Sequence, residues 1–530
     1  MKRIHPLITA IILLSVLTFT FFGGCAKDET VEDKSVITLK VMSWEDYIDD
    51  EEYVDEENDI YEGSVIEEFE KYCKETLHKN VKVEYSTVGT NEEMYTKINL
   101  NKESYDLVCP SEYMIQKMIG ENMLEKLDHT KTAVYDNNVS RYISDLFKKI
   151  PVTKADGSTE YLYDYAACYM WGTMGFVYNP EFVEEAEVTD WSAVWNKNFK
   201  NKCTIKDSVR DSYVLALGYV YHDVLMEYKA KLDAGEITAN EYNKQLTDIF
   251  NNVSDEAVEK TGVALKELAP TLYGYEVDSG KKDMAAGKIW INFAWSGDAV
   301  YAMDYAEDPE MVGEKTAELN YIVPEEGSNI FFDGWVMPKG SKVEIAQEYI
   351  NFISDPHYAQ RNMDYIGYTT SIATEDIFEN VIDNYGYANA VKIGDSYFAA
   401  DENDERILDE DGESVEVYPV DLSYLFKKGD DDDTDYTVYT DTLGRQFSAQ
   451  YPDYETVTRC TVMRHFTDEE VVKLNKMWEQ SKPTAWQGVF IASVIVIAVF
   501  VIAYVIYRLV SSDLFRPKPK KGYHIVDEQK

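Results

Sequence analysis

The 530-residue sequence has few of the side chains that crosslink chains or bind metals. It contains 6 cysteines, none in a CxxC pair, and 7 histidines. Disulfide scaffolds and cysteine zinc sites need closely spaced cysteines, so the sequence excludes both, and so few histidines leave little for metal catalysis. We therefore expect no metal centre and no cofactor. Five of the cysteines follow Cys25, and we expect them to be buried thiols.

Positive charge is also scarce. Lys and Arg number 51 against 97 Asp and Glu, a formal net charge of −46 at pH 7. A field this negative repels nucleic-acid phosphates and attracts cations, so no nucleic-acid partner is expected. Two explanations of the acidic surface stay open, namely simple solubility and the recruitment of a cationic partner.

Short catalytic motifs are absent as well. The sequence contains no GxSxG, no HExxH and no Gly-rich phosphate loop. Each of these motifs positions a nucleophile, a metal or a phosphate in a known way, so their absence favours a protein that is not an enzyme. An extracellular hydrolase without a short motif stays an alternative.

The N-terminus has the pattern of an export signal. Lys2 and Arg3 precede an uncharged apolar run over residues 7–22, and two glycines lead to Cys25. This order predicts a signal peptide over residues 1–25, with lipid attached to Cys25, and a polar linker over 26–36. An ordinary signal peptide and an uncleaved anchor are the alternatives. The protein is expected outside the cytoplasm.

The C-terminus has a second membrane signal. Residues 483–507 carry no charge, and 486–507 are long enough to span about 30 Å of hydrocarbon as a helix. Basic residues follow at Arg508, Arg516, Lys518, Lys520 and Lys521. Positive residues mark the cytoplasmic side, so we predict a transmembrane helix over 486–507 and a cytoplasmic tail over 508–530. The protein would then lie in the cell membrane with its binding domain extracellular or periplasmic.

Between these ends, short strand-like runs alternate with helical ones. ITLKVMSW, VKVEYSTV and YDLVCP read as strands, and the segments SVIEEFEKYCKETLHK, NEEMYTKINL and SEYMIQKMI read as helices. This alternation predicts an α/β sheet, and the length predicts two lobes. Ligands bind beyond the carboxyl ends of strands in such sheets, where Trp44 and Ser111 fall.

Two later regions differ in character. Residues 216–281 are charged, amphipathic and helical, whereas 396–458 are acidic, rich in Tyr, Thr and Val, and typical of a β-hairpin insertion. Asp409 and Asp411 before Gly412 faintly resemble a calcium loop. The rest of the calcium spacing is absent, which favours a solvated turn.

Six segments of the chain form a recognisable series. They are MSWEDYI (42–48), YDLVCPSEYMIQKM (105–118), KDSVRDSYVLAL (206–217), INFAWSGDA (291–299), GSNIFFDGWVMPKG (327–340) and DYIGYTTSI (364–372). These segments resemble the bacterial spermidine/putrescine-binding proteins of polyamine ABC transporters. They occur in the family's order over residues 37–375, with a weaker continuation to about 480.

The resemblance implies a two-lobed α/β fold of the type II periplasmic-binding-protein class, with a hinge and a cleft. Lobe 1 would comprise residues 37–160 and 334–480, including the acidic insertion, and lobe 2 would comprise 161–333. The implied role is capture of spermidine or putrescine for import, with ABC permease and ATPase subunits as partners. A protein of the same fold for iron or another small cation stays an alternative.

A polyamine needs carboxylates for its ammonium groups and aromatic faces for its methylenes. On the family's pattern, the ligand-binding residues are Trp44, Glu45, Tyr47, Ser111, Tyr113, Asp207, Asp211, Trp295, Phe331, Asp333 and Tyr368. Asp333 would be the principal carboxylate, and Asp298 is a nearby acid of lower rank.

Three positions depart from the family. Glu45 stands where a hydroxyl residue is usual, and Phe331 replaces a frequent Trp, which weakens cation–π attraction. Met463 and Arg464 fall where relatives offer an amide. An arginine facing a polycation is unfavourable, so Arg464 turns outward, pairs with a carboxylate, or indicates a different ligand.

Overall fold

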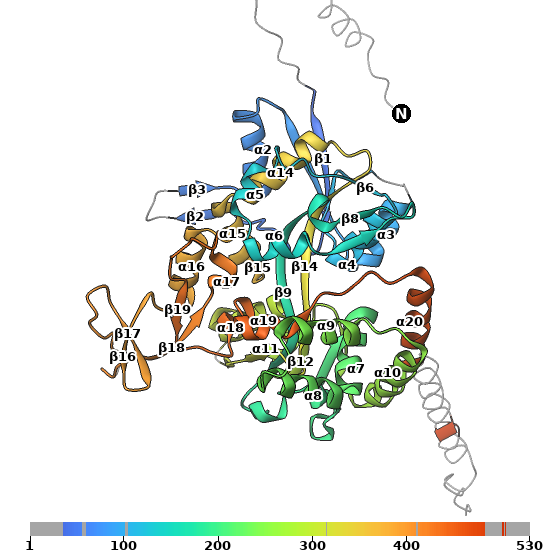
Figure 1. Cartoon of the computed structure of the whole chain (residues 1–530), viewed down its shortest axis with the longest axis vertical. Coiled ribbons are helices and arrows are strands. Elements are labelled where there is room, and N and C mark those ends of the chain that lie inside the picture. The colour runs from blue at the N-terminus through green and yellow to red at the C-terminus, as the bar shows by residue number, and fades with distance from the viewer. Residues whose placement is uncertain are drawn as a thin grey trace, which may run out of the picture.

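The computed structural model describes residues 35–482 except 56–59, 101–103, 314 and 410–411, together with 501, 502 and 504. The predicted signal peptide, Cys25 and most of the predicted segment 486–507 therefore lie outside the described residues. Within the described part of the chain, no helix is long and apolar enough to cross a membrane. The chain forms two α/β lobes, one above the other in Figure 1.

The first lobe is built on parallel strands. β1 (Ile37–Ser43) lies between β4 (Val81–Thr87) and β5 (Leu107–Val108). The helix α2 (Val65–Glu75) precedes β4, α3 (Asn91–Asn99) connects β4 to β5, and α4 (Glu112–Gly120) follows β5. These elements confirm the strands and helices predicted for this region. A capping box between Ser64 and Glu67 starts α2, whose side chains Phe69 and Cys73 are buried one turn apart.

Two long strands run from one lobe into the other. Every residue of β9 (Ala166–Tyr178) and β14 (Ser328–Pro338) is buried. The two strands pair antiparallel with each other, β14 also pairs with β5 of the first lobe, and the far end of β9 pairs with β12 (Ile291–Trp295) of the second. Their pairing shifts register between Asp333 and Gly334, which places a β-bulge near the lobe boundary.

The second lobe has its own short sheet covered by helices. β10 (Cys203–Lys206) is parallel to β11 (Gly274–Glu276) and to β12. The predicted helical region comprises α7 (Val209–Val220), α8 (His222–Asp233), α9 (Ala239–Phe250), α10 (Asp255–Leu268) and α11 (Gly280–Ala285), and α12 (Ser296–Glu307) follows β12. The carboxyl ends of β10 and β12 are Lys206 and Trp295.

The chain then returns to the first lobe. α14 (Val343–Ile353) packs against α2 and leads to α15 (Pro356–Ile366) and α16 (Glu375–Tyr385). The acidic region contains β17 (Ser396–Ala400), β18 (Glu416–Asp421) and β19 (Thr437–Thr440), which form an antiparallel sheet with β16 (Asn389–Ile393). Figure 1 shows β16 and β17 projecting from the body of the molecule.

The position of α20 (Asp468–Ser481) differs from the predicted lobe assignment. It packs against α10 and α7 of the second lobe, whereas the sequence placed residues 334–480 in the first. β20 (Cys460–Thr461) pairs with the start of β14. The remaining elements are β2 (Tyr53–Asp55), β3 (Ile60–Glu62), β6 (Leu124–Glu125), α5 (Ala133–Asn138), α6 (Arg141–Phe147), β7 (Pro151–Thr153), β8 (Thr159–Tyr161), α13 (Pro309–Val312), β13 (Asn320–Ile322), β15 (Thr369–Thr370), α17 (Ser423–Phe426), α18 (Gln446–Gln450) and α19 (Tyr454–Thr458), with five short 3-10 turns.

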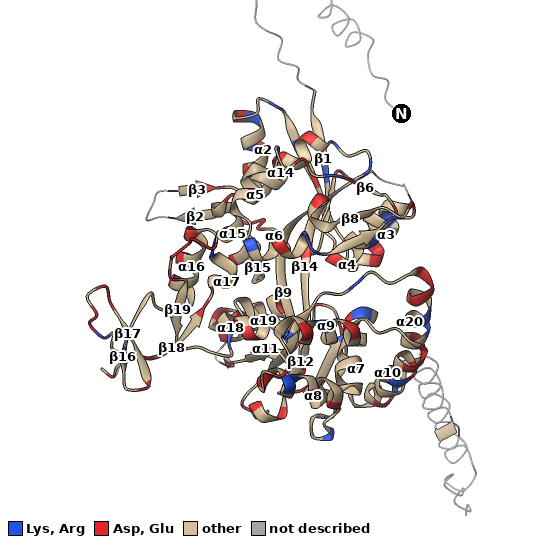
Figure 2. Cartoon of the chain, in the orientation of Figure 1, with Lys and Arg blue, Asp and Glu red and all other residues tan. Residues whose placement is uncertain are grey.

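Charge and cysteines follow the expectations from composition. Figure 2 shows acidic residues on both lobes and on the projecting sheet. Cys73, Cys109, Cys168, Cys203 and Cys460 are free and buried. They are therefore buried thiols, as predicted.

Candidate functional site

A cavity of about 350 Å³ is lined by residues of both lobes and of the strands that join them. All eleven predicted ligand-binding residues line it: Trp44, Glu45, Tyr47, Ser111, Tyr113, Asp207, Asp211, Trp295, Phe331, Asp333 and Tyr368. They come from segments more than 300 residues apart in sequence. The structure thus brings the set together, and the role of each residue toward a ligand stays a prediction.

Asp333 is a buried carboxylate that lines this cavity. Its side chain is only 5% exposed, and it accepts hydrogen bonds from the Tyr47 hydroxyl and the Ser111 hydroxyl, both at 2.7 Å. Burial raises its pKa to about 6, although the two hydroxyl donors act to lower it. No described cation pairs with Asp333, so its ionised form has only neutral donors around it.

The local backbone explains how Asp333 reaches the cavity. Asp333 lies opposite Met170 and Gly334 lies opposite Cys168, so Tyr169 is the additional residue of the bulge. A bulge redirects the neighbouring side chains of a strand. The Tyr169 hydroxyl in turn donates to the Tyr47 carbonyl at 3.2 Å, which holds the loop after β1 beside Asp333.

Asn91 holds the second hydroxyl donor in place. Ser111 precedes α4, and its backbone N–H donates to Asn91 Oδ1 at 2.9 Å. Asn91 Nδ2 donates to Ser111 Oγ at 3.0 Å. The Ser111 hydroxyl is therefore left with its proton for Asp333. Asn91 was missed by sequence analysis because nothing in its helical segment distinguishes it from a surface residue.

Aromatic rings form the wall beside Asp333. The Tyr47 and Tyr368 rings meet edge to face with centroids 5.3 Å apart, and Phe331 contacts Tyr368 at 6.0 Å. Trp44 also lines the cavity, and its buried Nε1 has no hydrogen-bond partner among the described residues. Such rings offer apolar faces for an alkyl chain and negative faces for a cation.

The second-lobe side carries a cation that sequence analysis missed. The Lys206 side chain is 1% exposed, and its Nζ lies 2.8 Å from Asp298 Oδ2 and 3.1 Å from Glu276 Oε1. The same Nζ lies 4.1 Å from the centroid of the Trp295 ring. Burial alone would lower the pKa of Lys206, but the charges of Asp298 and Glu276 raise it, so Lys206 is an ammonium.

A second lysine contributes to the same cluster. Lys281 Nζ lies 2.6 Å from Asp278 Oδ1 and 3.8 Å from Asp298 Oδ1. The Tyr368 hydroxyl donates to Asp298 Oδ1 at 3.1 Å. Burial would raise the pKa of Asp298, but Lys206 and Lys281 together hold it below its ordinary value. Asp298 is therefore an ionised carboxylate with its charge already balanced.

Arg210 is the third basic residue that lines the cavity, and it contacts the backbone of Arg464. The Arg210 guanidinium lies between the rings of Tyr113 and Phe466 and donates to the Arg464 carbonyl at 2.7 Å. The Arg464 side chain does not line the cavity and pairs with Glu470, with its nitrogens 2.8 and 3.1 Å from the carboxylate oxygens. Of the alternatives left open for Arg464, the structure has the pairing with a carboxylate.

The two aspartates of the KDSVRD segment differ. Asp207 pairs with Lys482, whereas Asp211 is buried and forms no salt bridge with any described residue. Burial raises the pKa of Asp211. Burial also raises the pKa of Glu112, another lining residue, to about 8, so Glu112 is protonated at neutral pH.

The lining is acidic overall. Nine lining residues are Asp or Glu and three are Lys or Arg. An acidic cavity with aromatic walls fits an organic cation that has an apolar chain. Sequence analysis missed Lys206 because nothing local in the sequence distinguishes it from the other lysines.

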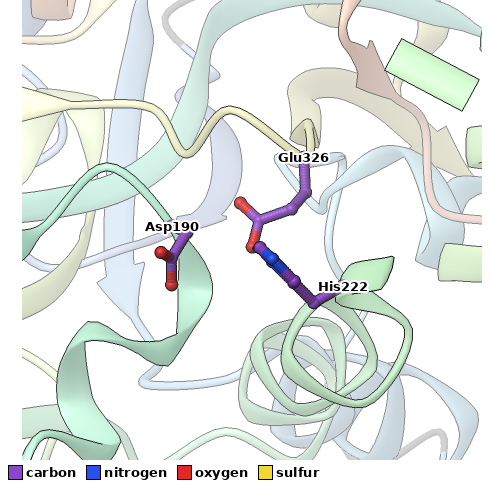
Figure 3. A group of neighbouring side chains, drawn as sticks. All are labelled: Asp190, His222 and Glu326. Carbon is purple, nitrogen blue, oxygen red and sulfur yellow. The ribbon is translucent and has the colours of Figure 1, made fainter. Parts of the chain in front are cut away.

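One further cluster lies away from the cavity. Asp190, His222 and Glu326 have side-chain ligand atoms within 4.8 Å of one another (Figure 3). Glu326 Oε1 accepts from the Trp191 N–H at 3.1 Å and faces His222 Nδ1 at 2.8 Å, while Asp190 caps the turn after it through the Ser192 N–H at 2.7 Å. These bonds join three segments of the second lobe, which accounts for the cluster without an ion.

Comparison with known proteins finds a matching family and similar relatives. Residues 64–381 match the bacterial extracellular solute-binding protein family. The spermidine/putrescine-binding periplasmic protein of Salmonella typhimurium is 26% identical over 303 residues, 57% of this chain and 72% of that protein. Spermidine/putrescine-binding periplasmic protein 1 of Haemophilus influenzae is 26% identical over 381 residues, 70% of this chain and 86% of that protein.

A solved structure has the same fold. The spermidine/putrescine ABC transporter substrate-binding protein PotD from Streptococcus pneumoniae superposes with a TM-score of 0.50 at 24% identity, covering 84% of this chain and 98% of that chain. The two-lobed periplasmic-binding-protein-like fold predicted from the sequence is therefore confirmed.

Proposed function

Because the chain belongs to the bacterial extracellular solute-binding proteins, we propose that it captures a polyamine of the putrescine and spermidine type. It would deliver this ligand to the permease and ATPase subunits of an ABC importer. The relatives named above bind spermidine and putrescine. A solute-binding protein carries out no reaction on its ligand, so the chain is not an enzyme.

The observation that carries the proposal is the environment of Asp333. A buried carboxylate with two neutral donors and no cation has a raised pKa of about 6. Its charge is costly until a cation approaches. A ligand ammonium beside Asp333 would supply that cation. Trp44, Tyr47, Phe331 and Tyr368 would enclose the methylenes next to it.

The other predicted residues receive roles from their positions. Asp211 would pair with a second ammonium because it is buried and has no salt bridge among the described residues. Ser111 and Tyr47 orient Asp333, and Tyr113 would form part of the wall with Arg210 behind it. Glu45 and Asp207 lie at the cavity lining and would raise the local concentration of cations.

The two ends of the chain would keep the protein at the membrane. The uncharged segment 486–507 is proposed to span the bilayer, with residues 508–530 in the cytoplasm, and Cys25 is proposed to carry lipid. Anchoring next to a permease raises the effective concentration of the loaded protein there.

Calorimetry on the full chain tests the function. We expect putrescine or spermidine to bind, and lysine and arginine to bind at least about 100-fold more weakly, because their carboxylate would face Asp333 or Asp211. Asp333→Asn keeps the shape but removes the charge, and we expect it to reduce polyamine affinity about 10- to 100-fold.

Asp364→Asn is the matched control. Asp364 lies on α15 and does not line the cavity, so this variant is expected to bind like the parent chain. Equal polyamine affinity of Asp333→Asn and the parent would contradict the proposed site. Tighter binding of lysine or arginine than of both polyamines would contradict the proposed ligand class.

A further inference from the structure

Lys206 meets the surroundings that a ligand ammonium would meet. Its Nζ lies 4.1 Å from the Trp295 ring centroid, 2.8 Å from Asp298 and 3.1 Å from Glu276. It also donates to the Val277 carbonyl at 2.9 Å. An aromatic face, two carboxylates and a carbonyl form a complete cation site. In this chain, one of its own side chains fills that site.

The fold holds Lys206 in this position. Lys206 and Glu276 are register partners at the ends of the parallel strands β10 and β11, so their side chains lie next to each other. Trp295 ends the neighbouring strand β12, and Asp298 follows in the first turn of α12. All four residues thus meet at the carboxyl edge of the second-lobe sheet, where the cavity opens.

The salt bridges of the buried carboxylates limit how many of them can pair with a ligand ammonium. Asp298 is paired with both Lys206 and Lys281. Glu112 is protonated at neutral pH. Among the other buried carboxylates that line the cavity, Asp333 and Asp211 are left without a salt bridge to any described residue. The buried part of the cavity therefore offers two positions for ammonium groups.

We propose that Lys206 acts as a built-in ammonium that selects a short diamine over a longer triamine. This inference rests on the proposed function. Putrescine has two ammonium groups, which Asp333 and Asp211 can accept. A third ammonium, as in spermidine, would be directed at the face of Trp295 and would have to displace Lys206 from Asp298 and Glu276. Lys206 would thus set ligand length by occupying the last cation position.

The test compares putrescine and spermidine by calorimetry on the full chain and on Lys206→Met. We expect the parent chain to bind putrescine at least about tenfold more tightly than spermidine. Methionine has similar length but no charge, so the position of the Lys206 ammonium beside Asp298 and Glu276 becomes available to the third ammonium. Lys206→Met is therefore expected to shift the spermidine-to-putrescine affinity ratio at least about tenfold toward spermidine.

Lys202→Met is the control for removing a lysine from an aromatic face. Lys202 Nζ lies 4.8 Å from the Trp290 ring, and Lys202 is outside the cavity. This variant is expected to keep the parent ratio. If the uncompensated acids prevent Lys206→Met from folding, the double variant Lys206→Met with Glu276→Gln removes one of them and keeps Asp298. The same shift toward spermidine is expected of it.

The outcomes separate this inference from the proposed function. Putrescine binding that depends on Asp333, with an unchanged ratio in the Lys206 variants, overturns the inference and leaves the function standing. A parent chain that prefers spermidine also overturns the inference alone. If neither polyamine binds to any variant, both proposals fail.

Discussion

At the scale of single residues, two buried aspartates of the cavity have pKa values shifted in opposite directions. Asp333 and Asp298 are both buried carboxylates. The pKa of Asp333 is raised by burial to about 6, whereas the charges of Lys206 and Lys281 hold the pKa of Asp298 below its ordinary value. Burial acts alike on both, so the nearby cations decide the difference. Asp333 is ready for an external cation, and Asp298 is not.

The raised pKa of Asp333 predicts how binding depends on pH. Polyamine ammonium groups prefer the ionised carboxylate, which is lost as the pH falls through about 6. Affinity for putrescine is therefore expected to be roughly tenfold lower at pH 5 than at pH 7. Calorimetry between pH 5 and pH 7 measures this change in affinity. Asp333→Asn is expected to show a smaller dependence, because the carboxylate whose protonation weakens binding is already absent, and an equal dependence would contradict the assignment.

The same shift predicts a stability change in the ligand-free protein. The folded-state pKa of Asp333, about 6, lies above the value of about 4 in an unfolded chain. The folded state thus binds more protons between these values, so this group lowers stability as the pH rises from about 4 to 6. The cost is fully present above pH 6, where a bound cation would offset it. Comparing urea unfolding of the parent and Asp333→Asn over this range isolates the contribution.

At the scale of elements, close packing of α12 against the first lobe's return segment positions Tyr368. Gly297 lies in the first turn of α12, and a Cβ atom built there would overlap the Tyr368 ring. Tyr368 in turn donates to Asp298 and meets Tyr47 edge to face. The absence of a side chain at one helix position therefore allows the aromatic wall to form.

Gly297→Ala tests this arrangement. In an open helix position the change would add up to about 1 kcal/mol of stability. Here we expect a loss of about 1–3 kcal/mol, because the ring must move, together with weaker polyamine binding. Thermal unfolding and calorimetry measure the two effects. Gly274→Ala on β11 is the control, since a Cβ there meets nothing within 4 Å, and similar behaviour of both variants would contradict the argument.

At the scale of the whole molecule, the cavity is lined by both lobes and by the strands that join them. Asp333 lies beside the bulge of the joining strands β9 and β14, while Lys206 and Trp295 end strands of the second lobe. A ligand held by both sets would favour the closed arrangement of the lobes. The chain has a formal net charge of −46, and a field of this sign attracts cations.

This field predicts a salt effect on the rate of binding. Raising NaCl from 0.05 to 0.5 M is expected to lower the association rate of putrescine about tenfold or more and to change its dissociation rate much less. Stopped-flow fluorescence measures both rates. Asp333→Asn is expected to act mainly on dissociation, because it removes a buried contact rather than the long-range field. If salt changed the dissociation rate alone, long-range attraction could not be what controls association, and the prediction would be contradicted.

The sequence by itself determined the family, the alternation of strands and helices, and the eleven residues that line the cavity. The strands and helices follow from local periodicity. The family and the eleven residues follow from the resemblance carried by short segments such as NIFFDGW, whose residues lie in one strand. The sequence also left several alternatives open for Arg464, and the salt bridge to Glu470 shows that its side chain pairs with a carboxylate.

Only the tertiary structure decided which charges are balanced. Lys206 is one of many lysines in the sequence, and nothing local distinguishes it from Lys202. The fold sets the surroundings of Lys206, because β10, β11 and β12 end together and bring Glu276, Trp295 and Asp298 around its ammonium group. Electrostatic energies depend on distances and burial between residues far apart in the chain, and folding sets those distances.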